Sequence, residues 1–260
     1  MAAEAGKVRI ERVGEHVAHV LMDRPSARNA IDVDMAVALE AAADELEADA
    51  AIRAVVLSGA GDKAFSAGAD LATIAAGRDQ ELLRPRGGYL GLTAYPRRKP
   101  WIAAIRGVAA GGGLELALSC DLIVAGDNAR LGLPEVSRGT IAGSCGVFRL
   151  PARVAHSIAL EWLLTGELVA APRAYEAGLL NRVVPDAQVI AEALTLAAGI
   201  AQNSPLAVRE TLAIARAATR MDEADARVVT EAASQRLRAS PDNREGALAF
   251  LEKRAPRWAD

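Results

Sequence analysis

Three consecutive glycines, Gly111-Gly112-Gly113, stand between an apolar segment typical of a buried strand and a segment predicted to be helical. A backbone without side chains approaches a ligand closely, and a helix start offers unpaired N–H groups with a partial positive charge. The stretch therefore predicts a place where an oxygen that gains negative charge is stabilised. Glu115 follows one helical turn after Gly112 and can face the same point. Taken alone, the pattern also fits an ordinary amphipathic helix with a solvated Glu115.

Segments typical of strands alternate with segments typical of helices over most of the chain, which indicates the α/β class. Asp32 is expected to begin a helix that runs to about Asp49, and after residue 187 only helices are expected. We therefore expect a core over residues 1–199 and a helical oligomerisation region over residues 200–260. The expected strands are Val8–Ile10, Val17–Met22, Arg53–Ser58, Trp101–Ile105 and Leu122–Ala125.

The composition excludes several classes of protein. The chain has 260 residues, 52% of them hydrophobic, and a formal net charge of −3. This charge gives no support to nucleic-acid binding or to attraction by an acidic membrane surface. The N-terminal residues lack the apolar core of a signal peptide, and the most apolar region, residues 101–126, contains charged side chains. We therefore expect a cytoplasmic protein that makes no use of a membrane.

Common metal and nucleophile motifs are also missing from the sequence. The two cysteines, Cys120 and Cys145, lack the spacing of a zinc site or a disulfide framework, and no metal is expected. His16 and His19 fall on opposite faces of a strand, which argues against a shared metal. No serine stands in a nucleophile elbow, and no motif supports Cys145 as a nucleophile.

A second acidic residue, Glu135, stands between apolar neighbours in Leu133-Pro134-Glu135-Val136. Because glutamate is rarely buried without a partner, a loop residue near the surface is the ordinary interpretation. Two carboxylates in one pocket would instead push their pKa values apart, leaving one as base and one as proton donor. The Ala67-Gly68-Ala69-Asp70 segment is likewise either a tight turn or a place where a backbone N–H faces inward.

A series of short motifs runs through the whole chain. In order, they are Arg24-Pro25-Ser26-Ala27-Arg28-Asn29-Ala30, Phe65-Ser66-Ala67-Gly68-Ala69-Asp70-Leu71, Lys99-Pro100-Trp101-Ile102-Ala103-Ala104-Ile105, Gly111-Gly112-Gly113-Leu114-Glu115-Leu116-Ala117, Cys120-Asp121, Leu133-Pro134-Glu135 with Gly139, Leu163-Leu164-Thr165-Gly166, Ala177-Gly178-Leu179-Leu180-Asn181 and Val183-Val184-Pro185. Each motif alone is weak. Together, from Val8 to Trp258, they resemble the crotonase (enoyl-CoA hydratase/isomerase) superfamily, and an enoyl-CoA hydratase most of all.

The resemblance implies a spiral of β-β-α turns with a C-terminal helical region, assembled as a homotrimer or a dimer of trimers. It implies an acyl-CoA thioester as substrate and no separate cofactor, since coenzyme A is part of the substrate. The N–H groups of Ala69 and Gly112 would hold the thioester oxygen as it gains enolate character. Glu115 would help activate water for addition at C3, Glu135 would donate a proton to C2, and the Gly143 N–H would help hold the water.

The residues that match the coenzyme A groove of the superfamily are Arg28, Ala30, Ala67, Asp70, Leu71 and, as a weaker match, Lys253. The sequence departs from the usual hydratase pattern after Gly139. Ala142 stands where proline is usual, Cys145 replaces a glycine, and Val147-Phe148 replaces a polar pair. These changes leave the preferred acyl group open.

Three functions stay open, and the two glutamates favour the first. Retention of Glu115 and Glu135 favours reversible syn addition of water across the 2,3 double bond of a 2-enoyl-CoA. An enoyl-CoA isomerase can work with one acid/base residue and is the alternative within the superfamily. A non-catalytic scaffold or RNA-binding member is the alternative from another class, and the net negative charge disfavours it.

Overall fold

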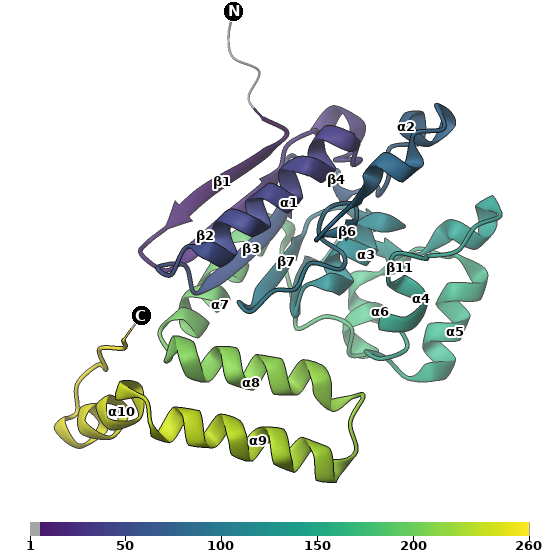
Figure 1. The fold of residues 1–260 in the computed structure, drawn as a ribbon. Coiled ribbons are helices and arrows are strands. Elements are labelled where there is room, and N and C mark those ends of the chain that lie inside the picture. Colours follow the sequence, from purple (N-terminus) through teal and green to yellow (C-terminus); the bar gives the residue numbers. More distant parts are fainter. Residues whose placement is uncertain (1–5, 260) are drawn as a thin grey trace, which may run out of the picture.

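Two sheets form the centre of the fold, with helices on both sides (Figure 1). The computed structural model describes residues 6–259. The strands are β1 (Val8–Val13), β2 (Val17–Met22), β3 (Ala54–Gly59), β4 (Ala64–Ser66), β5 (Leu83–Arg84), β6 (Gly88–Tyr89), β7 (Trp101–Ile105), β8 (Val108–Ala110), β9 (Leu122–Gly126), β10 (Arg130–Gly132), β11 (Val169–Ala170) and β12 (Arg182–Val184). The α-helices are α1 (Val33–Ala48), α2 (Leu71–Ala75), α3 (Gly112–Ser119), α4 (Gly146–Arg149), α5 (His156–Thr165), α6 (Ala171–Glu176), α7 (Val189–Ala201), α8 (Pro205–Ala218), α9 (Glu223–Arg238) and α10 (Pro241–Glu252). Short 3₁₀ helices are η1 (Pro25–Ala27), η2 (Asp79–Leu82), η3 (Pro134–Arg138) and η4 (Asp186–Gln188).

The larger sheet has the strand order β1-β2-β3-β7-β9-β12, and the smaller sheet has the order β11-β10-β8-β4. In the larger sheet β1 pairs antiparallel with β2, and every later pair is parallel. Parallel strands are covered on both faces, so their sequences are mainly apolar. Val55 and Leu57 of β3 join the main core, whereas Ala54 and Val56 pack with α7 on the opposite face.

The expected strands are all present, and the helix after Asp32 begins and ends where the sequence predicts. The Asp32 side chain accepts a hydrogen bond from the Met35 N–H at 3.0 Å, which satisfies one free donor of the first turn of α1. In β1 the strand continues to Val13, three residues beyond its expected end, because the pairing with β2 extends to Val17.

The helix α3 is buried on almost every side, which corrects the alternative of an amphipathic helix with a solvated Glu115. Gly113 to Ser119 are all buried, and the Glu115 residue is 3% exposed. The helix starts directly after β8 because Gly111 adopts φ 57°, a conformation that glycine reaches without strain. A helix that is apolar all round belongs in a core, so the glutamate on it is held inside the molecule.

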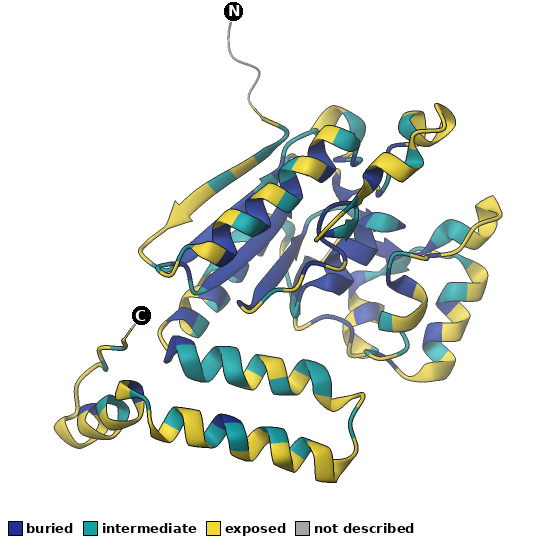
Figure 2. Ribbon diagram, viewed as in Figure 1, coloured by how far each residue is buried: buried dark blue, intermediate teal, exposed yellow. Residues whose placement is uncertain are grey.

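The chain after η4 is helical, as the sequence predicts. The helix α7 packs on the larger sheet through Val189, Ala193 and Ala197, whereas α8, α9 and α10 lie beside the core with much of their surface exposed (Figures 1 and 2). The domain boundary expected after residue 199 falls in the last turn of α7, and α8 begins at Pro205. The division into two domains stays a prediction.

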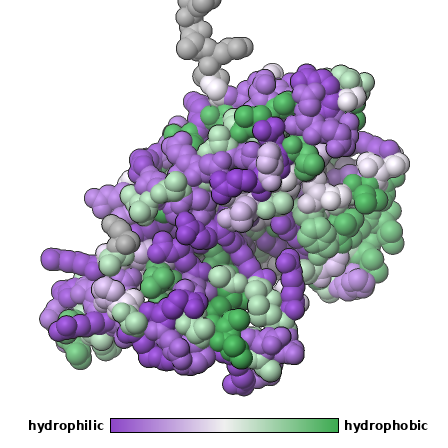
Figure 3. Space-filling view, viewed as in Figure 1, coloured by the Kyte–Doolittle hydropathy of each residue, from purple (hydrophilic) through white to green (hydrophobic). Residues whose placement is uncertain are grey.

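Apolar side chains also reach the surface. Figure 3 shows them gathered at the right of the molecule, where Figure 1 places α4 and α5. The exposed apolar residues of this region are Ile141, Val147, Phe148, Leu160 and Leu164. No helix within residues 6–259 is long and apolar enough to cross a membrane.

Candidate active site

A cavity of about 1040 Å³ lies between the N-terminus of α3, the turn before α2 and the segment that follows β10. It brings together every site residue expected from the sequence except Lys253. The expected residues on its wall are Arg28, Ala30, Ala67, Ala69, Asp70, Leu71, Gly112, Glu115, Glu135 and Gly143. Segments that are distant in the sequence therefore meet around one space.

The backbone segments that carry the Ala69 and Gly112 N–H groups lie close together on the wall of this cavity. A β-carbon on Gly68 would lie 2.7 Å from the Gly112 nitrogen, and one on Gly112 would lie 3.4 Å from the Ala69 nitrogen. Within residues 6–259, neither the Ala69 N–H nor the Gly112 N–H finds a protein acceptor. Two free N–H donors on a backbone with small side chains or none are suited to stabilise an oxygen that becomes negatively charged.

The Glu115 carboxylate is fixed by the start of α4. Its Oε1 accepts hydrogen bonds from the Cys145 N–H at 2.8 Å and from the Gly146 N–H at 2.9 Å. Gly146 is needed for this contact, because a β-carbon there would press on Ala142, Leu133 and Glu115 Oε1. The two N–H donors fix the orientation of this carboxyl group on the cavity wall. This geometry suits a carboxylate that accepts a proton.

Glu135 lies in η3, also on the cavity wall, and has different surroundings. Its Oε2 is buried and finds no hydrogen-bond partner among the described residues, and its Oε1 lies against the backbone of Gly111. Burial raises the pKa of Glu135, and the negative charge of Glu115 raises it further. The two carboxyl groups therefore share one cavity but differ in their surroundings. N–H donors anchor Glu115, whereas burial favours the protonated form of Glu135.

The segment that departs from the hydratase pattern lies next to these carboxyl groups. The Cys145 thiol donates to the Glu115 backbone carbonyl at 3.2 Å, and burial raises its pKa to about 11. Val147 and Phe148 of α4 are exposed, so these two changes lie on the surface of the chain. Gly143 lines the cavity, but its N–H donates to the Ile141 carbonyl at 2.7 Å. A role for that N–H in holding water requires this turn to open, and it stays a prediction.

Apart from Lys253, the residues expected along the coenzyme A groove line the cavity, and Leu71 among them is strongly exposed. The Asp70 carboxylate differs from the rest because protein donors already occupy it. It accepts from the Ala72 and Thr73 N–H groups at 2.8 and 3.1 Å and pairs with Arg24. Lys253 ends α10 and does not line the cavity. Its expected contact with a ligand phosphate stays a prediction.

Among the cavity-wall residues that sequence reasoning did not assign to the site are the polar residues Tyr89, Arg138 and Ser144. Burial raises the pKa of Tyr89, as do the charges of Asp79 and Glu115, so the phenol stays protonated near neutral pH. The glycines around Tyr89 were an available signal, since glycine marks places where the backbone packs closely. Within the described part of the chain, no cluster of His, Cys, Asp and Glu side chains is arranged to hold a metal.

The sequence and the fold both have close relatives. The chain is 41% identical over 248 residues to a putative enoyl-CoA hydratase of Thermus thermophilus, covering 94% of this chain and 97% of the relative. It is 38% identical over 247 residues to the carnitinyl-CoA dehydratase of Proteus mirabilis, covering 93% and 94% of the two chains. The solved structure of an enoyl-CoA hydratase from Mycobacterium tuberculosis matches with a TM-score of 0.94 and 37% identity, over 98% of this chain and 99% of that one.

These likenesses confirm the crotonase fold expected from the motifs. The family model described as enoyl-CoA hydratase/isomerase matches residues 12–260, and this chain belongs to that family.

Proposed function

We propose that this protein hydrates a 2-enoyl-CoA by reversible syn addition of water across the 2,3 double bond. The observation that carries the proposal is the pair of carboxyl groups, Glu115 and Glu135, in different surroundings around one cavity. A thioester makes C2 acidic and C3 electrophilic, so the enzyme must stabilise an enolate and move protons locally.

Each group then has one task. The N–H groups of Ala69 and Gly112 hold the thioester oxygen as electron density moves onto it. The Glu115 carboxylate takes a proton from water, and the hydroxyl oxygen bonds to C3. Glu135 is the proton donor to C2, because its surroundings favour the protonated form. The proton left on Glu115 returns to Glu135 through solvent once the 3-hydroxyacyl-CoA product leaves.

Isomerisation of a 3-enoyl-CoA is the second candidate. It uses the same enolate and the same oxyanion donors, but one carboxyl group can carry the proton from C2 to C4. The anchoring of Glu115 by two N–H donors favours hydration, because a second carboxyl group held in the site has no task in such an isomerase.

Dehydration of a hydroxyacyl-CoA with a cationic acyl group is a related candidate, supported by the likeness to carnitinyl-CoA dehydratase. Carnitine carries a trimethylammonium group, which the face of an aromatic ring attracts. Tyr89 supplies such a ring on the cavity wall. The acyl group is therefore proposed to be either apolar or cationic.

The test follows the absorbance of the conjugated enoyl thioester in water enriched in ¹⁸O. Hydration predicts loss of absorbance and one ¹⁸O in the product, whereas isomerisation of a 3-enoyl-CoA predicts a gain of absorbance without ¹⁸O. Crotonyl-CoA, longer 2-enoyl-CoAs and crotonobetainyl-CoA are compared to define the acyl group. Glu135→Gln should lower turnover by ~10²–10⁴, and Glu15→Gln, in the exposed turn after β1, is the control. Absence of turnover with every substrate, together with salt-sensitive RNA binding, would favour the non-catalytic alternative.

We also propose that the protein assembles as a homotrimer or a dimer of trimers. The exposed apolar residues of α4 and α5, among them Phe148 and Leu164, support an assembled state because such patches are uncommon on monomers. Light scattering during gel filtration measures the mass of the assembly, and a monomer at micromolar concentration would contradict the proposal.

A further inference from the structure

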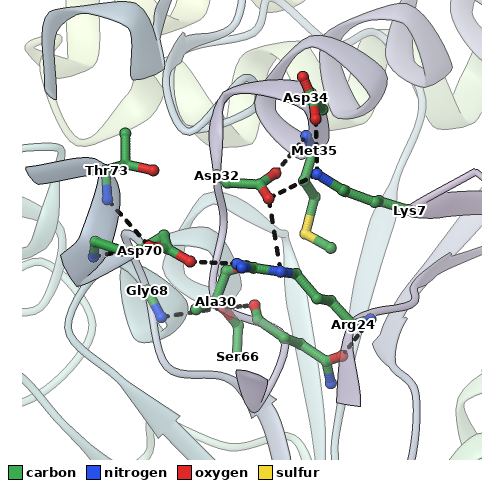
Figure 4. Close-up of polar contacts among 12 residues, drawn as sticks. Lys7, Arg24, Ala30, Asp32, Asp34, Met35, Ser66, Gly68, Asp70 and Thr73 are labelled. Carbon is green, nitrogen blue, oxygen red and sulfur yellow. Dashed lines mark hydrogen bonds and ion pairs between the residues drawn. The ribbon is translucent and has the colours of Figure 1, made fainter. Parts of the chain in front are cut away.

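Arg24 was not among the site residues expected from the sequence, but it connects two segments of the cavity wall (Figure 4). Its Nη1 donates to the Ala30 carbonyl at 3.0 Å and also to the Asp70 carboxylate. Its Nε lies 3.6 Å from the Asp32 carboxylate, at the start of α1. A single guanidinium therefore joins the segment before α1 to the turn before α2.

Asp70 directly follows Ala69, whose N–H faces the cavity. The Asp70 Oδ1 accepts from the Ala72 and Thr73 N–H groups and so begins α2, while Oδ2 faces Arg24. Asp70 is buried. The residue after the expected oxyanion donor is thus held at both carboxylate oxygens.

The backbone on both sides of Ala69 is fixed as well. The Ile31 N–H donates to the Gly68 carbonyl at 2.8 Å, and the Asp70 N–H donates to the Ile31 carbonyl at 2.9 Å. Successive N–H groups of an extended chain point in opposite directions. Because the Asp70 N–H points toward Ile31, the Ala69 N–H points away from it and toward the cavity.

The outer part of the network is anchored on regular structure. Asp32 caps α1, and Lys7 donates to both Asp32 and Asp34 at 2.7 Å (Figure 4). Arg24 is therefore held from one side by a helix terminus, and through Asp70 it holds the turn on the other side. A planar guanidinium with several donors in a fixed geometry can make these contacts together, whereas the ammonium of lysine acts as a point charge.

We propose that Arg24 is a positioning residue that, through Asp70, sets the direction of the Ala69 N–H in the oxyanion site. The inference rests on the proposed function, since it concerns the polarisation of a thioester carbonyl. Loss of one oxyanion donor lowers kcat by ~10²–10³. A donor that is misdirected, but still present, should cost less, and we expect kcat to fall by roughly tenfold.

The experiment measures carbonyl polarisation separately from turnover. The probe is butyryl-CoA labelled with ¹³C at the thioester carbonyl, which has no double bond to hydrate. Isotope-edited infrared spectra of the bound probe report the shift of the C=O stretch to lower frequency. The variants are Arg24→Gln, Arg24→Lys and Asp70→Asn, where the asparagine keeps an oxygen that can cap α2. The control is Arg9→Gln, which removes the exposed ion pair with Asp23 at 2.9 Å.

For Arg24→Gln and Asp70→Asn we expect a smaller carbonyl shift and a kcat lower by roughly tenfold, with KM within about threefold of the unmodified protein. Arg24→Lys should recover part of the shift, and Arg9→Gln should retain all of it. The Arg24→Gln/Asp70→Asn double variant should be no worse than either single variant, because both act through one contact.

Two results would overturn the inference. One is a carbonyl shift in folded Arg24→Gln and Asp70→Asn equal to that of the unmodified protein. The other is additive loss in the double variant, since independent effects would then explain both residues. If the unmodified protein neither binds butyryl-CoA nor shifts its carbonyl, the proposed function fails and the inference fails with it. If the unmodified protein binds butyryl-CoA and shifts its carbonyl stretch, and the variants show the same shift, the inference fails while the proposed function stands.

Discussion

Gly68 lies so close to Gly112 that a β-carbon on Gly68 would stand 2.7 Å from the Gly112 nitrogen. Gly68 also adopts φ 84°, which an L side chain rarely does. Glycine at position 68 therefore has two roles: it allows the backbone conformation of the turn, and it leaves room between the two free N–H groups.

We expect Gly68→Ala to lower kcat by ~10² or more, because the added methyl group separates or blocks the two oxyanion donors. Gly178→Ala is the matched control, since Gly178 has φ 85° and nothing within 4 Å of an added β-carbon. Both variants carry the strain of a left-handed alanine, which is ~1–2 kcal/mol. Steady-state kinetics and thermal unfolding of the pair separate the two effects, and equal activity in both variants would contradict the oxyanion assignment.

Removal of the Glu135 carboxyl group tests the proton donor. We expect Glu135→Gln to lower kcat by ~10²–10⁴, the range for general acid–base catalysis, while binding of a saturated acyl-CoA is retained. In the unmodified protein the donor must be protonated, so kcat for hydration should fall as pH rises through the raised pKa of Glu135. A hydration rate that rises over that range would assign the donor to another group.

The same substitution has an expected effect on stability. Because burial raises the pKa of Glu135, the folded state binds this proton more tightly than the unfolded state does. Unfolding free energy should therefore decrease as pH rises from the ordinary glutamate pKa through the folded value. Glu135→Gln should be the more stable protein at pH 7, and the difference should vanish below both pKa values. Urea unfolding at a series of pH values measures it, and a variant less stable than the unmodified protein at pH 7 would contradict the sign.

Most of the fold follows from local pattern. The apolar run Trp101–Ile105 is a strand at the predicted residues, and Asp32 begins a helix because its side chain satisfies a neighbouring N–H. Gly112 and Glu115 stand on one helical turn, so their approach to a common cavity follows from spacing alone.

The environment of the site does not follow from local pattern. Glu115 can be buried because the N–H groups of Cys145 and Gly146, about thirty positions later, donate hydrogen bonds to its carboxyl group. Arg24 reaches Asp70 across 46 positions. Neither secondary-structure propensity nor hydrophobic periodicity predicts such long-range contacts, since they depend on how elements such as β4, α3 and α4 pack together. The motif around Arg24 was visible in the sequence, but its contact with the turn was not.

Both cysteines should resist alkylation in the folded protein. Burial raises the pKa of Cys120 and of Cys145 to about 11, so the reactive thiolate is scarce at neutral pH. We expect no modification by iodoacetamide at pH 7.5 until denaturant unfolds the chain, when both thiols react. Mass spectrometry counts the adducts. Rapid labelling of Cys145 in the folded protein would instead indicate that the segment beside Glu115 opens.

Arg216 of α8 holds the helical region against the core. Its Nε and Nη2 donate to the Asp121 carboxylate at 2.7 and 2.8 Å, and that carboxylate also accepts from the Trp101 N–H at 2.8 Å. Removing one partner of a largely buried pair leaves the other charge without compensation, and we expect Arg216→Gln to cost about 2 kcal/mol of unfolding free energy.

The matched control is Arg236→Gln. Arg236 makes the same two-pronged contact with Glu210, at 2.8 and 2.7 Å, but its side chain is 56% exposed against 32% for Arg216. Since water and salt screen an exposed pair, its loss should cost much less unfolding free energy than the loss of the Arg216 contact. Guanidinium unfolding is a poor choice for this comparison because the denaturant is itself a salt, so urea is used. Equal losses in the two variants would mean that burial of the Asp121 carboxylate does not control the strength of the contact between α8 and the core.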